Sequence, residues 1–409
     1  MTFLEAAGWT VLMGGATSIF LTIARQLTTL RRGKEIYREE MRLLGERLSA
    51  VRASRRKAEV STAPWNGTRK FRVEKKTVEK GDVCSFYLSP HDGKLPLPHF
   101  MPGQFLTFQL TIDGRSETRC YSLSDSPDPN YYRVSIKRCA PPRDEPDAPP
   151  GLVSSYFHDT LDEGDLLDVL APRGAFTIDP AEGTPLVLSG AGIGVTPVFS
   201  MMKSLIDVKS RREIYFFYGV RNGGENMIAE DIREWRALDL PNVHVHVCFS
   251  NPAPEDIKGE DYDHKSRVSV ELFKELLQSN NFEYYTCGPG RMMDSIRDGL
   301  AEWGVPSERV HDEAFIAVKK AVEVKAATVS FRKSGKSLQV SGAATSLLDL
   351  ATTEGITIPF GCCTGGCGTC KTAIISGKVE YECTPKIHVE SGSCLPCVCL
   401  PNGDLVLDA

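Results

Sequence analysis

The sequence predicts a chain of several domains that combines all-β and parallel α/β folds and begins with a helix. Three observations support this prediction. Short strand-like segments occupy residues 65–180, apolar strands that end in small-residue turns occupy residues 181–316, and most of the 13 cysteines lie beyond residue 360. With 409 residues, 41% of them hydrophobic, the chain is long enough to build about two to four domain cores.

The charge and the cysteine content exclude some classes of protein. The net charge of −5 hides a basic segment, because residues 25–57 contain eleven Lys and Arg against four Glu and the rest of the chain is therefore acidic. An acidic folded part does not support nucleic-acid binding. Thirteen cysteines gathered mainly in one region are too few for a disulfide scaffold. They indicate a reducing compartment and cofactor ligation.

Residues 1–64 are predicted to form a membrane helix and a basic helical stalk. Residues 6–24 carry no charge, and as a helix they would span about 28 Å, enough for the hydrocarbon core of a bilayer. The alternative is a buried helix of a soluble protein. The stalk has a heptad seam made of Leu27, Leu30, Tyr37, Met41, Leu44, Leu48 and Val51. This seam would either pair two stalks in a homodimer or pack on the main body.

The basic stalk also predicts where the protein is found. Lys and Arg next to a membrane helix favour the cytoplasmic side. We therefore expect a protein of the cell inner membrane whose later domains face the cytoplasm, or a soluble cytoplasmic protein if the helix does not insert.

Residues 65–180 are expected to form a small antiparallel barrel, because strand-like segments alternate with turns rich in Gly and Pro. Residues 119–124 of this region read Arg-Cys-Tyr-Ser-Leu-Ser. Arg119 offers a forked donor to a phosphate, Tyr121 a flat ring for stacking, and Ser122 a short hydrogen bond. Gly-Leu-Val-Ser-Ser then opens a helical stretch at Gly151, and the N–H groups of a helix start bind diphosphates well.

These motifs, together with Ala-Pro-Arg-Gly-Ala-Phe at 171–176, resemble the FAD-binding barrel of the ferredoxin–NADP reductase superfamily. The resemblance implies that Arg119 and Ser154 meet flavin phosphates, that Tyr121 flanks the isoalloxazine ring, and that Ser122 lies near its reactive nitrogen. The flavin-binding residues that it implies are Arg119, Tyr121, Ser122, Leu123, Ser135, Lys137, Gly151, Val153 and Ser154. FAD is the expected cofactor, and FMN, which some relatives hold, is the alternative.

Residues 181–316 are expected to form a parallel α/β domain that binds a nucleotide. The apolar run 185–189 is typical of a buried parallel strand, and it leads into Gly-Ala-Gly-Ile-Gly-Val-Thr-Pro at 190–197. The spacing G-x-G-x-G departs from the usual dinucleotide fingerprint. Segments 214–221 and 284–293 are each an apolar strand that ends in a small-residue turn, and ligands bind beyond such carboxyl ends in an open α/β sheet.

The superfamily resemblance extends over this half through the motifs G-x-G-x-x-P and C-G-P-x-x-M. It implies NADH or NADPH as the electron donor, with Cys287 and Thr196 beside the nicotinamide and with Glu313 and Phe315 approaching the flavin. Arg221 would hold a 2′-phosphate, without deciding between the two nucleotides. The nucleotide-binding residues implied are Gly190, Gly192, Gly194, Thr196, Pro197, Arg221, Cys287, Gly288, Pro289 and Phe315. The catalytic residues implied are Ser122, Cys287 and Glu313.

Residues 317–325 are predicted to be a linker, and residues 326–409 a domain that holds a [2Fe-2S] cluster. Cys362, Cys367 and Cys370 stand at the C-x4-C-x2-C spacing of plant-type clusters. The glycines between them let the backbone wrap closely round the sulfurs. This domain resembles plant-type ferredoxin along its whole length, which implies the β-grasp fold.

The fourth cluster ligand must come from far along the chain. Cys397, in the setting Leu-Pro-Cys-Val, is preferred, with Cys394 and Cys399 as competitors. The alternative metal is zinc, held by the C-x2-C pair Cys367 and Cys370 and by the pair Cys394 and Cys397. A zinc site would leave Cys362 without a role, so the cluster is preferred.

Taken in order along the chain, the three regions resemble a flavin domain, a nicotinamide domain and a ferredoxin. This is the domain order of phthalate dioxygenase reductase and its relatives. The resemblance implies an NAD(P)H-dependent reductase that passes electrons through FAD to a [2Fe-2S] cluster. Because nicotinamide gives two electrons at once and iron–sulfur clusters carry one, a flavin between them is chemically sensible. The terminal acceptor would be a partner oxygenase or desaturase, including a membrane-embedded one. The alternative function is a membrane-tethered scaffold with structural zinc and no redox activity.

Overall fold

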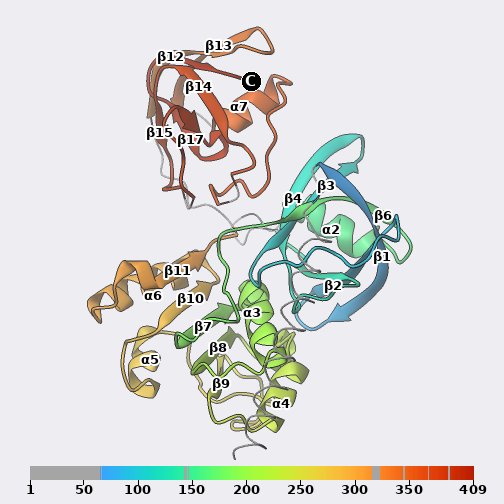
Figure 1. Ribbon diagram of the computed structural model, residues 1–409, viewed down its shortest axis with the longest axis vertical. Coiled ribbons are helices and arrows are strands. Elements are labelled where there is room, and N and C mark those ends of the chain that lie inside the picture. The colour runs from blue at the N-terminus through green and yellow to red at the C-terminus, as the bar shows by residue number, and fades with distance from the viewer. Residues whose placement is uncertain are drawn as a thin grey trace, which may run out of the picture. The chain divides into compact units, whose positions relative to one another are not determined.

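The computed structural model describes residues 65, 67–141, 145, 147–315, 323–343, 346–366, 368–385 and 387–409 (Figure 1). The predicted membrane helix and stalk, residues 1–64, lie outside these residues, and so does Cys367. Within the described ranges, no helix is both long enough and apolar enough to cross a membrane. Residues 64–409 form one compact unit of the chain.

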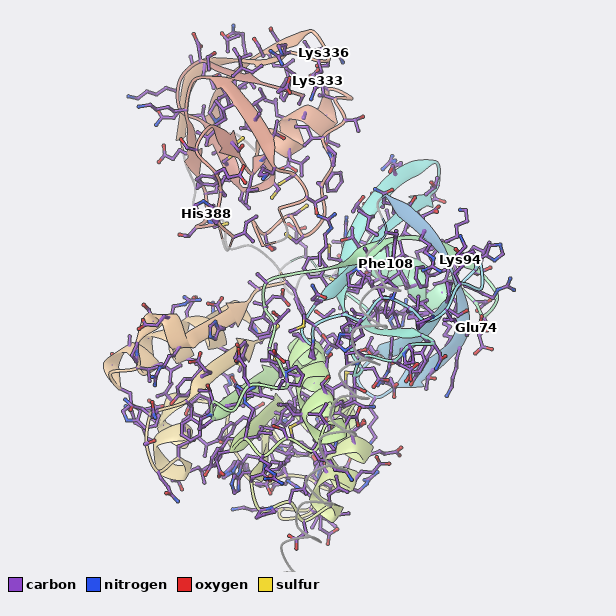
Figure 2. All side chains as sticks on the ribbon, viewed as in Figure 1. Glu74, Lys94, Phe108, Lys333, Lys336 and His388 are labelled. Carbon is purple, nitrogen blue, oxygen red and sulfur yellow. The ribbon has the colours of Figure 1, made fainter. Side chains whose placement is uncertain are left out.

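The first part of this unit is an antiparallel β-barrel, as predicted. Its sheet has the strand order β4-β3-β6-β1-β2-β5, and a bridge between Leu123 and Val134 links the two edges. The core contains Phe71, Phe108 and Phe157, none of them accessible to solvent, and Figure 2 shows Phe108 in the barrel. The elements are β1 (Thr68–Glu79), β2 (Val83–Pro90), β3 (Phe105–Ile112), β4 (Arg115–Ser122), β5 (Tyr132–Lys137), α2 (Leu152–Asp159) and β6 (Leu166–Arg173).

The second part is a parallel α/β domain with the strand order β11-β10-β7-β8-β9. Helices α3 and α4 pack in one hydrophobic cluster and α5 and α6 in another, so both faces of the sheet are covered. The elements are β7 (Leu186–Ala191), η1 (Gly192–Gly194), α3 (Val195–Asp207), β8 (Ile214–Val220), η2 (Gly223–Glu225), α4 (Ala229–Ala237), β9 (Val243–Phe249), α5 (Val270–Leu276), β10 (Glu283–Cys287), α6 (Gly290–Glu302), η3 (Ser307–Arg309) and β11 (Val310–Glu313).

The third part has its own hydrophobic cluster around a mixed sheet with the order β13-β12-β18-β14-β16. The parallel pairing of β12 with β18 brings the start and the end of this part together. Lys333 lies in the turn between β12 and β13, and Lys336 is the first residue of β13 (Figure 2). The elements are β12 (Glu323–Phe331), β13 (Lys336–Ala343), α7 (Leu347–Thr353), β14 (Thr372–Ser376), β15 (Val379–Tyr381), β16 (Ser393–Cys394), η4 (Pro396–Val398), β17 (Cys399–Pro401) and β18 (Leu405–Leu407).

One predicted boundary is wrong. Strand β12 begins at Glu323, inside the segment 317–325 that was predicted to be a linker. The residues Glu323 and Val324 already pair with β13. The charged and small residues of this segment resemble a linker in sequence, but the backbone of its described part, from Glu323 onward, belongs to the hairpin.

Candidate functional site

Two turns of the α/β domain meet at the carboxyl edge of its sheet. A Cβ atom on Gly194 would lie 2.7 Å from the carbonyl oxygen of Cys287 and 2.7 Å from Cα of Gly288. Real Cβ atoms do not approach backbone that closely, so only glycine fits at this position. The turn after β7 and the turn after β10 are therefore in contact, at the place where open α/β sheets bind ligands.

The predicted nicotinamide residues lie along this edge. In the strand register, Cys287 is opposite Gly190 on one side and opposite Glu313 on the other. The Cys287 side chain is fully buried. Thr196 is also buried, and its hydroxyl donates to the carbonyl oxygen of Ile193 at 3.0 Å. The Thr196 hydroxyl therefore holds the turn in shape, and its donor is already used.

The remaining nucleotide-binding residues frame the same edge. Gly192 has a φ of +54°, and a Cβ atom added to it would meet no other atom within 4 Å, so the turn is open on that side. Pro197 lies in the first turn of α3, and Pro289 precedes the first residue of α6. Arg221 follows β8, with 61% of its side chain exposed and its guanidinium 3.8 Å from a carboxylate oxygen of Glu225.

Strand β4 presents the residues of the Arg-x-Tyr-Ser motif on two faces. Tyr121 packs edge-on against Phe157, with ring centroids 5.3 Å apart, and this contact is on the side of α2. Burial raises the pKa of the Tyr121 phenol. Arg119 donates to the carbonyl oxygen of Thr118 and lies 3.2 Å from Glu117, so its charge is partly matched already. Ser122 is buried and points to the opposite face.

Helix α2 starts with backbone donors that no side chain caps. Its N-cap residue is Gly151, whose position leaves no room for a Cβ because Cys139 would be 2.7 Å away. The Ser154 hydroxyl donates to the carbonyl oxygen of Gly151 at 2.9 Å and accepts from the Cys139 N–H at 3.0 Å. The first N–H groups of α2, beside Val153, therefore have no side-chain cap, and such groups are the ones that bind anions at helix starts. The Ser154 hydroxyl serves to fix the turn.

Three other predicted flavin residues have roles within the barrel. Ser135 is buried, and its hydroxyl bonds with those of Ser85 and Ser124 at 2.8 Å each. The Leu123 side chain lies in the core, so only its backbone can reach a ligand. Lys137 ends β5 and is half-buried. For Ser135, the structure therefore shows a hydroxyl already engaged inside the barrel.

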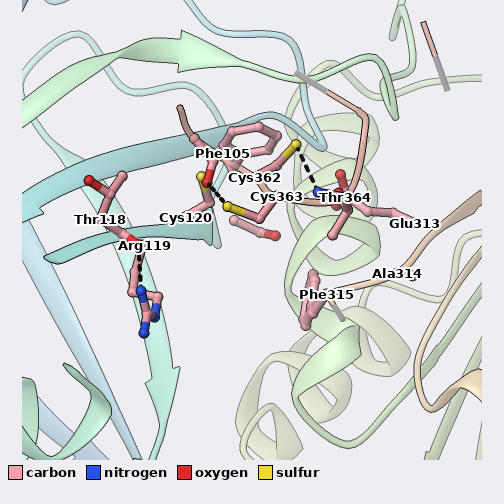
Figure 3. A pocket seen from close by; sticks show the side chains of 12 residues that line it. Phe105, Thr118, Arg119, Cys120, Glu313, Ala314, Phe315, Cys362, Cys363 and Thr364 are labelled. Atoms are coloured by element: carbon pink, nitrogen blue, oxygen red, sulfur yellow. Dashed lines mark hydrogen bonds between the residues drawn. The ribbon is translucent and has the colours of Figure 1, made fainter. Parts of the chain in front are cut away.

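A cavity of about 350 Å³ brings together three segments that are far apart in sequence (Figure 3). Its walls include Ser122, Glu313, Phe315 and Cys362. A second cavity, of about 240 Å³, shares Phe105, Glu313 and Cys362 with the first. Glu313 therefore lies both beside Cys287 at the carboxyl edge of the sheet and in the walls of these cavities.

The sequence motifs did not single out Phe105 and Cys120, which also line the first cavity. Phe105 is opposite Ser122 in the pairing of β3 with β4, and Gly174 approaches its ring. Cys120 bonds with Thr107 at 3.1 Å, and its pKa is raised chiefly by burial. The alternation of side chains along β4 was a sequence signal for Cys120, because it places Cys120 on the same face of the strand as Ser122.

Three of the four predicted cluster ligands, Cys362, Cys370 and Cys397, lie close together in the third part. The sulfurs of Cys370 and Cys397 are 3.2 Å apart although the two residues are 27 positions apart in the sequence. The N–H of Gly366 donates to the Cys362 sulfur at 3.3 Å. The N–H of Gly365 donates to Cys397. Backbone N–H groups that point at cysteine sulfurs are typical of iron–sulfur sites, and these donors fit a [2Fe-2S] cluster.

The competing cysteines pair with each other. Cys394 and Cys399 are fully buried and share a hydrogen bond, which together with burial raises the pKa of Cys399. The zinc alternative requires Cys394 to join Cys370 and Cys397. In the described part of the chain Cys394 lies beside Cys399 instead.

Comparisons with protein families identify three domains. Residues 70–178 match the oxidoreductase FAD-binding domain, residues 188–298 the oxidoreductase NAD-binding domain, and residues 331–402 the 2Fe-2S iron-sulfur cluster binding domain. Flavohemoproteins are similar to part of the chain: that of Halalkalibacterium halodurans is 37% identical over 261 residues, and that of Bordetella pertussis is 37% identical over 254. These alignments cover 63% and 61% of this chain and 62% and 61% of the relatives. The chain thus spans less than two thirds of these relatives.

Solved structures extend the likeness to the third part. Phthalate dioxygenase reductase, described as a modular structure for electron transfer from pyridine nucleotides to [2Fe-2S], matches with a TM-score of 0.56 and 28% identity. That match covers 84% of this chain and 98% of the other. The FAD/NAD-binding domain of nitric oxide dioxygenase from Vibrio cholerae matches with a TM-score of 0.53 and 29% identity, over 61% of this chain and 99% of that one.

Proposed function

We propose that this chain is an NAD(P)H-dependent electron-transfer reductase. It has an FAD-binding barrel, an NAD-binding α/β domain and a [2Fe-2S] domain, in the order of phthalate dioxygenase reductase. The observation that carries the proposal is the position of Glu313. It lies in register with Cys287 at the nicotinamide edge and also lines the cavity that Ser122 and Cys362 border. One short segment thus connects the three proposed redox sites.

For the flavin, the chain supplies positioning and charge. The uncapped start of α2 and the Arg119 guanidinium would hold the diphosphate, and Ser122 would border the reactive edge of the ring. Tyr121 would flank the ring. FAD can accept two electrons as a hydride and release them one at a time. FAD is proposed over FMN because the helix start offers a site for a second phosphate.

For the nicotinamide, the turns after β7 and β10 would bind the nucleotide, with Cys287 and Glu313 beside the reacting carbon. The close approach of these turns at Gly194 supports this, since it fixes their spacing. Arg221 would contact the adenosine end. Its proximity to Glu225 partly offsets its charge.

For the cluster, the proposed ligands are Cys362, Cys367, Cys370 and Cys397. The short distance between the sulfurs of Cys370 and Cys397 and the backbone donors aimed at Cys362 and Cys397 support this set. The electrons would then pass to a partner oxygenase, desaturase or other terminal acceptor protein.

The absorption spectrum and the electron acceptors of the purified full-length protein test this function. We expect flavin and iron–sulfur absorption, FAD released on denaturation, and anaerobic bleaching by NADH or NADPH. Cytochrome c and ferricyanide should both be reduced. A colourless protein that carries zinc would support the scaffold instead.

We also propose that residues 6–24 anchor the protein to a membrane, with the basic stalk on its cytoplasmic face. Confinement to the bilayer would raise the effective concentration of a membrane-embedded acceptor. The full chain should sediment with membranes and resist alkaline carbonate, whereas a shortened chain that starts near Pro64 should not sediment and should still reduce cytochrome c. Full-length protein found in the supernatant without detergent would contradict the anchor and leave the reductase proposal standing.

A further inference from the structure

A largely buried ionic cluster joins the barrel to helix α3. The Lys203 ammonium lies 2.8 Å from a carboxylate oxygen of Asp125 in the barrel and 3.7 Å from Asp231 on α4. One turn earlier on α3, the Ser200 hydroxyl donates to the backbone carbonyl oxygen of Asp125 at 2.6 Å. We call these four residues, Asp125, Ser200, Lys203 and Asp231, the Lys203 cluster.

Asp125 is held from the barrel side as well. Its second carboxylate oxygen accepts from the Tyr131 hydroxyl at 3.1 Å, and the preceding residue, Ser124, bonds through its backbone N–H with the carbonyl oxygen of Arg133 at 2.8 Å. The Arg133 guanidinium lies over the ring of Phe199 on α3, 5.7 Å from its centroid. The segment after β4 therefore has little freedom to move relative to α3.

The cluster sets one ammonium group, that of Lys203, between the carboxylates of Asp125 and Asp231. Burial opposes the charge of Lys203, but Asp125 and Asp231 together keep the pKa of the ammonium above its ordinary value. A buried ion pair adds little net stability compared with apolar packing, and its directional bonds favour one arrangement. Apolar contacts already join the two domains, because Val83, Phe176 and Ile178 share a core with α3. These apolar contacts hold the two domains together, and the ionic cluster fixes their relative orientation.

Both ends of the cluster lead directly to the proposed reaction centre. Asp125 follows Ser122 by three residues, and Ser122 lines the flavin cavity. Ser200 and Lys203 follow Thr196 by about one and two turns of the same helix, which begins at the dinucleotide turn. A change at the cluster would therefore shift the flavin-binding strand relative to the nucleotide-binding turn.

We propose that the Lys203 cluster is a positioning device that sets the approach of the nicotinamide to the flavin, so that Lys203 and Asp125 govern the rate of hydride transfer. This inference rests on the proposed function. In that step the C–H bond of the reduced nicotinamide would break, an N–H bond would form on the flavin, and both electrons of the broken bond would pass with the hydrogen, so that no further reactant is needed. Such transfers depend steeply on distance, and a displacement of 1 Å can slow a reaction about a hundredfold.

The test uses the flavin-loaded full-length protein and the variants Lys203→Met and Asp125→Asn. Anaerobic single-turnover mixing with NADH and NADPH gives the rate constant of flavin reduction and, from its concentration dependence, the nucleotide dissociation constant. We expect the rate constant to fall about tenfold to a hundredfold, with nucleotide affinity and flavin content unchanged. The double variant should be reduced no more slowly than Lys203→Met, because each single change already removes the same ion pair between Lys203 and Asp125.

Two controls separate positioning from general stability. Arg233→Met removes an exposed cation that lies 3.6 Å from Glu230 on α4, and it should leave the rate constant unchanged. Lys203→Arg keeps the charge and should restore most of the rate. Should Lys203→Met fail to fold, Asp125→Asn, which has the same shape as the native side chain, and Lys203→Arg decide the question.

Wild-type rate constants in both Lys203→Met and Asp125→Asn would overturn the inference. So would a slower reduction that is fully explained by lost flavin or weaker nucleotide binding. If neither nucleotide reduces the wild-type protein, the proposed function itself fails. If the wild-type protein is reduced and the variants are reduced equally fast, only the inference about the Lys203 cluster fails.

Discussion

Cys394 and Cys397 stand three residues apart, yet their thiols have different neighbours. Cys397 lies against Cys370, whereas Cys394 lies against Cys399 in the hydrophobic core. The residues between them lead into the short helix η4, which turns the two side chains in different directions. The cysteine that each thiol contacts therefore distinguishes the proposed ligand Cys397, which lies beside another proposed ligand, from Cys394, which lies beside a core cysteine.

The first prediction follows from these partners. Cys397→Ser should lose most of the iron and the visible absorption of the cluster while flavin stays bound, because the barrel has a separate core. Cys394→Ala, the matched control, should keep the cluster and lower the free energy of unfolding by about 1 kcal/mol. Iron analysis and electron paramagnetic resonance of the reduced protein check both. Loss of the cluster only in Cys394→Ala would show that the ligand is assigned to the wrong cysteine.

The second prediction concerns Cys287, which is buried between Gly190 and Glu313 at the carboxyl edge of the sheet, where we propose that the nicotinamide binds. Cys287→Ala removes the sulfur that borders the proposed hydride path. Flavin reduction by NAD(P)H should slow about tenfold or more, with flavin content unchanged. Anaerobic stopped-flow absorbance measures the rate, and a variant reduced as fast as the wild type would remove Cys287 from the site.

Among the structural elements, the turn between β7 and α3 combines two different glycines. Gly192 needs a left-handed backbone but has free space around it, whereas Gly194 has an ordinary backbone but no space. The first leaves room for a ligand to approach the backbone. The second lets the turn touch the end of β10.

The third prediction separates these two roles. Gly194→Ala would force a methyl group against the backbone of Cys287 and Gly288, and it should lower the free energy of unfolding by about 2–3 kcal/mol. Gly192→Ala should lower it by only about 1 kcal/mol through backbone strain, while it weakens nucleotide binding. Chemical denaturation and nucleotide titration measure the two effects. Equal losses of stability in the two variants would contradict this division.

Across the three domains, the barrel and the α/β domain share hydrophobic contacts, whereas the [2Fe-2S] domain has a core of its own. Val83 of the barrel belongs to the same cluster as Leu186 and Phe199 of the α/β domain. Among the described residues, the hydrophobic core that contains Cys397 is made only of residues from Val324 onward. The first two domains should therefore fold as one unit without the third.

The fourth prediction tests this modularity. A chain that ends at residue 316 should keep its flavin and reduce ferricyanide with NAD(P)H at a rate near that of the full chain. It should lose most of its cytochrome c reduction, because the one-electron carrier is gone. Steady-state assays with the two acceptors decide it. Undiminished cytochrome c reduction would mean that the flavin serves that acceptor directly.

Features that depend on neighbours along the chain could be predicted from the sequence. Alternation in 105–110 and 132–137 predicted barrel strands, and the glycines after residue 189 predicted a strand-to-helix turn, because side-chain period and backbone freedom are local properties. The spacing of Cys362, Cys367 and Cys370 likewise predicted a [2Fe-2S] domain, which the family comparison confirms.

Which distant groups meet could be learned only from the folded chain. The fold places Cys397 against Cys370, engages the hydroxyl of Ser135 inside the barrel, and begins β12 within the predicted linker. It also brings Lys203 to Asp125, a contact that no motif predicts. The physical reason is that these contacts depend on how helices and strands pack, and packing distances between segments are not encoded in the spacing of residues within either one.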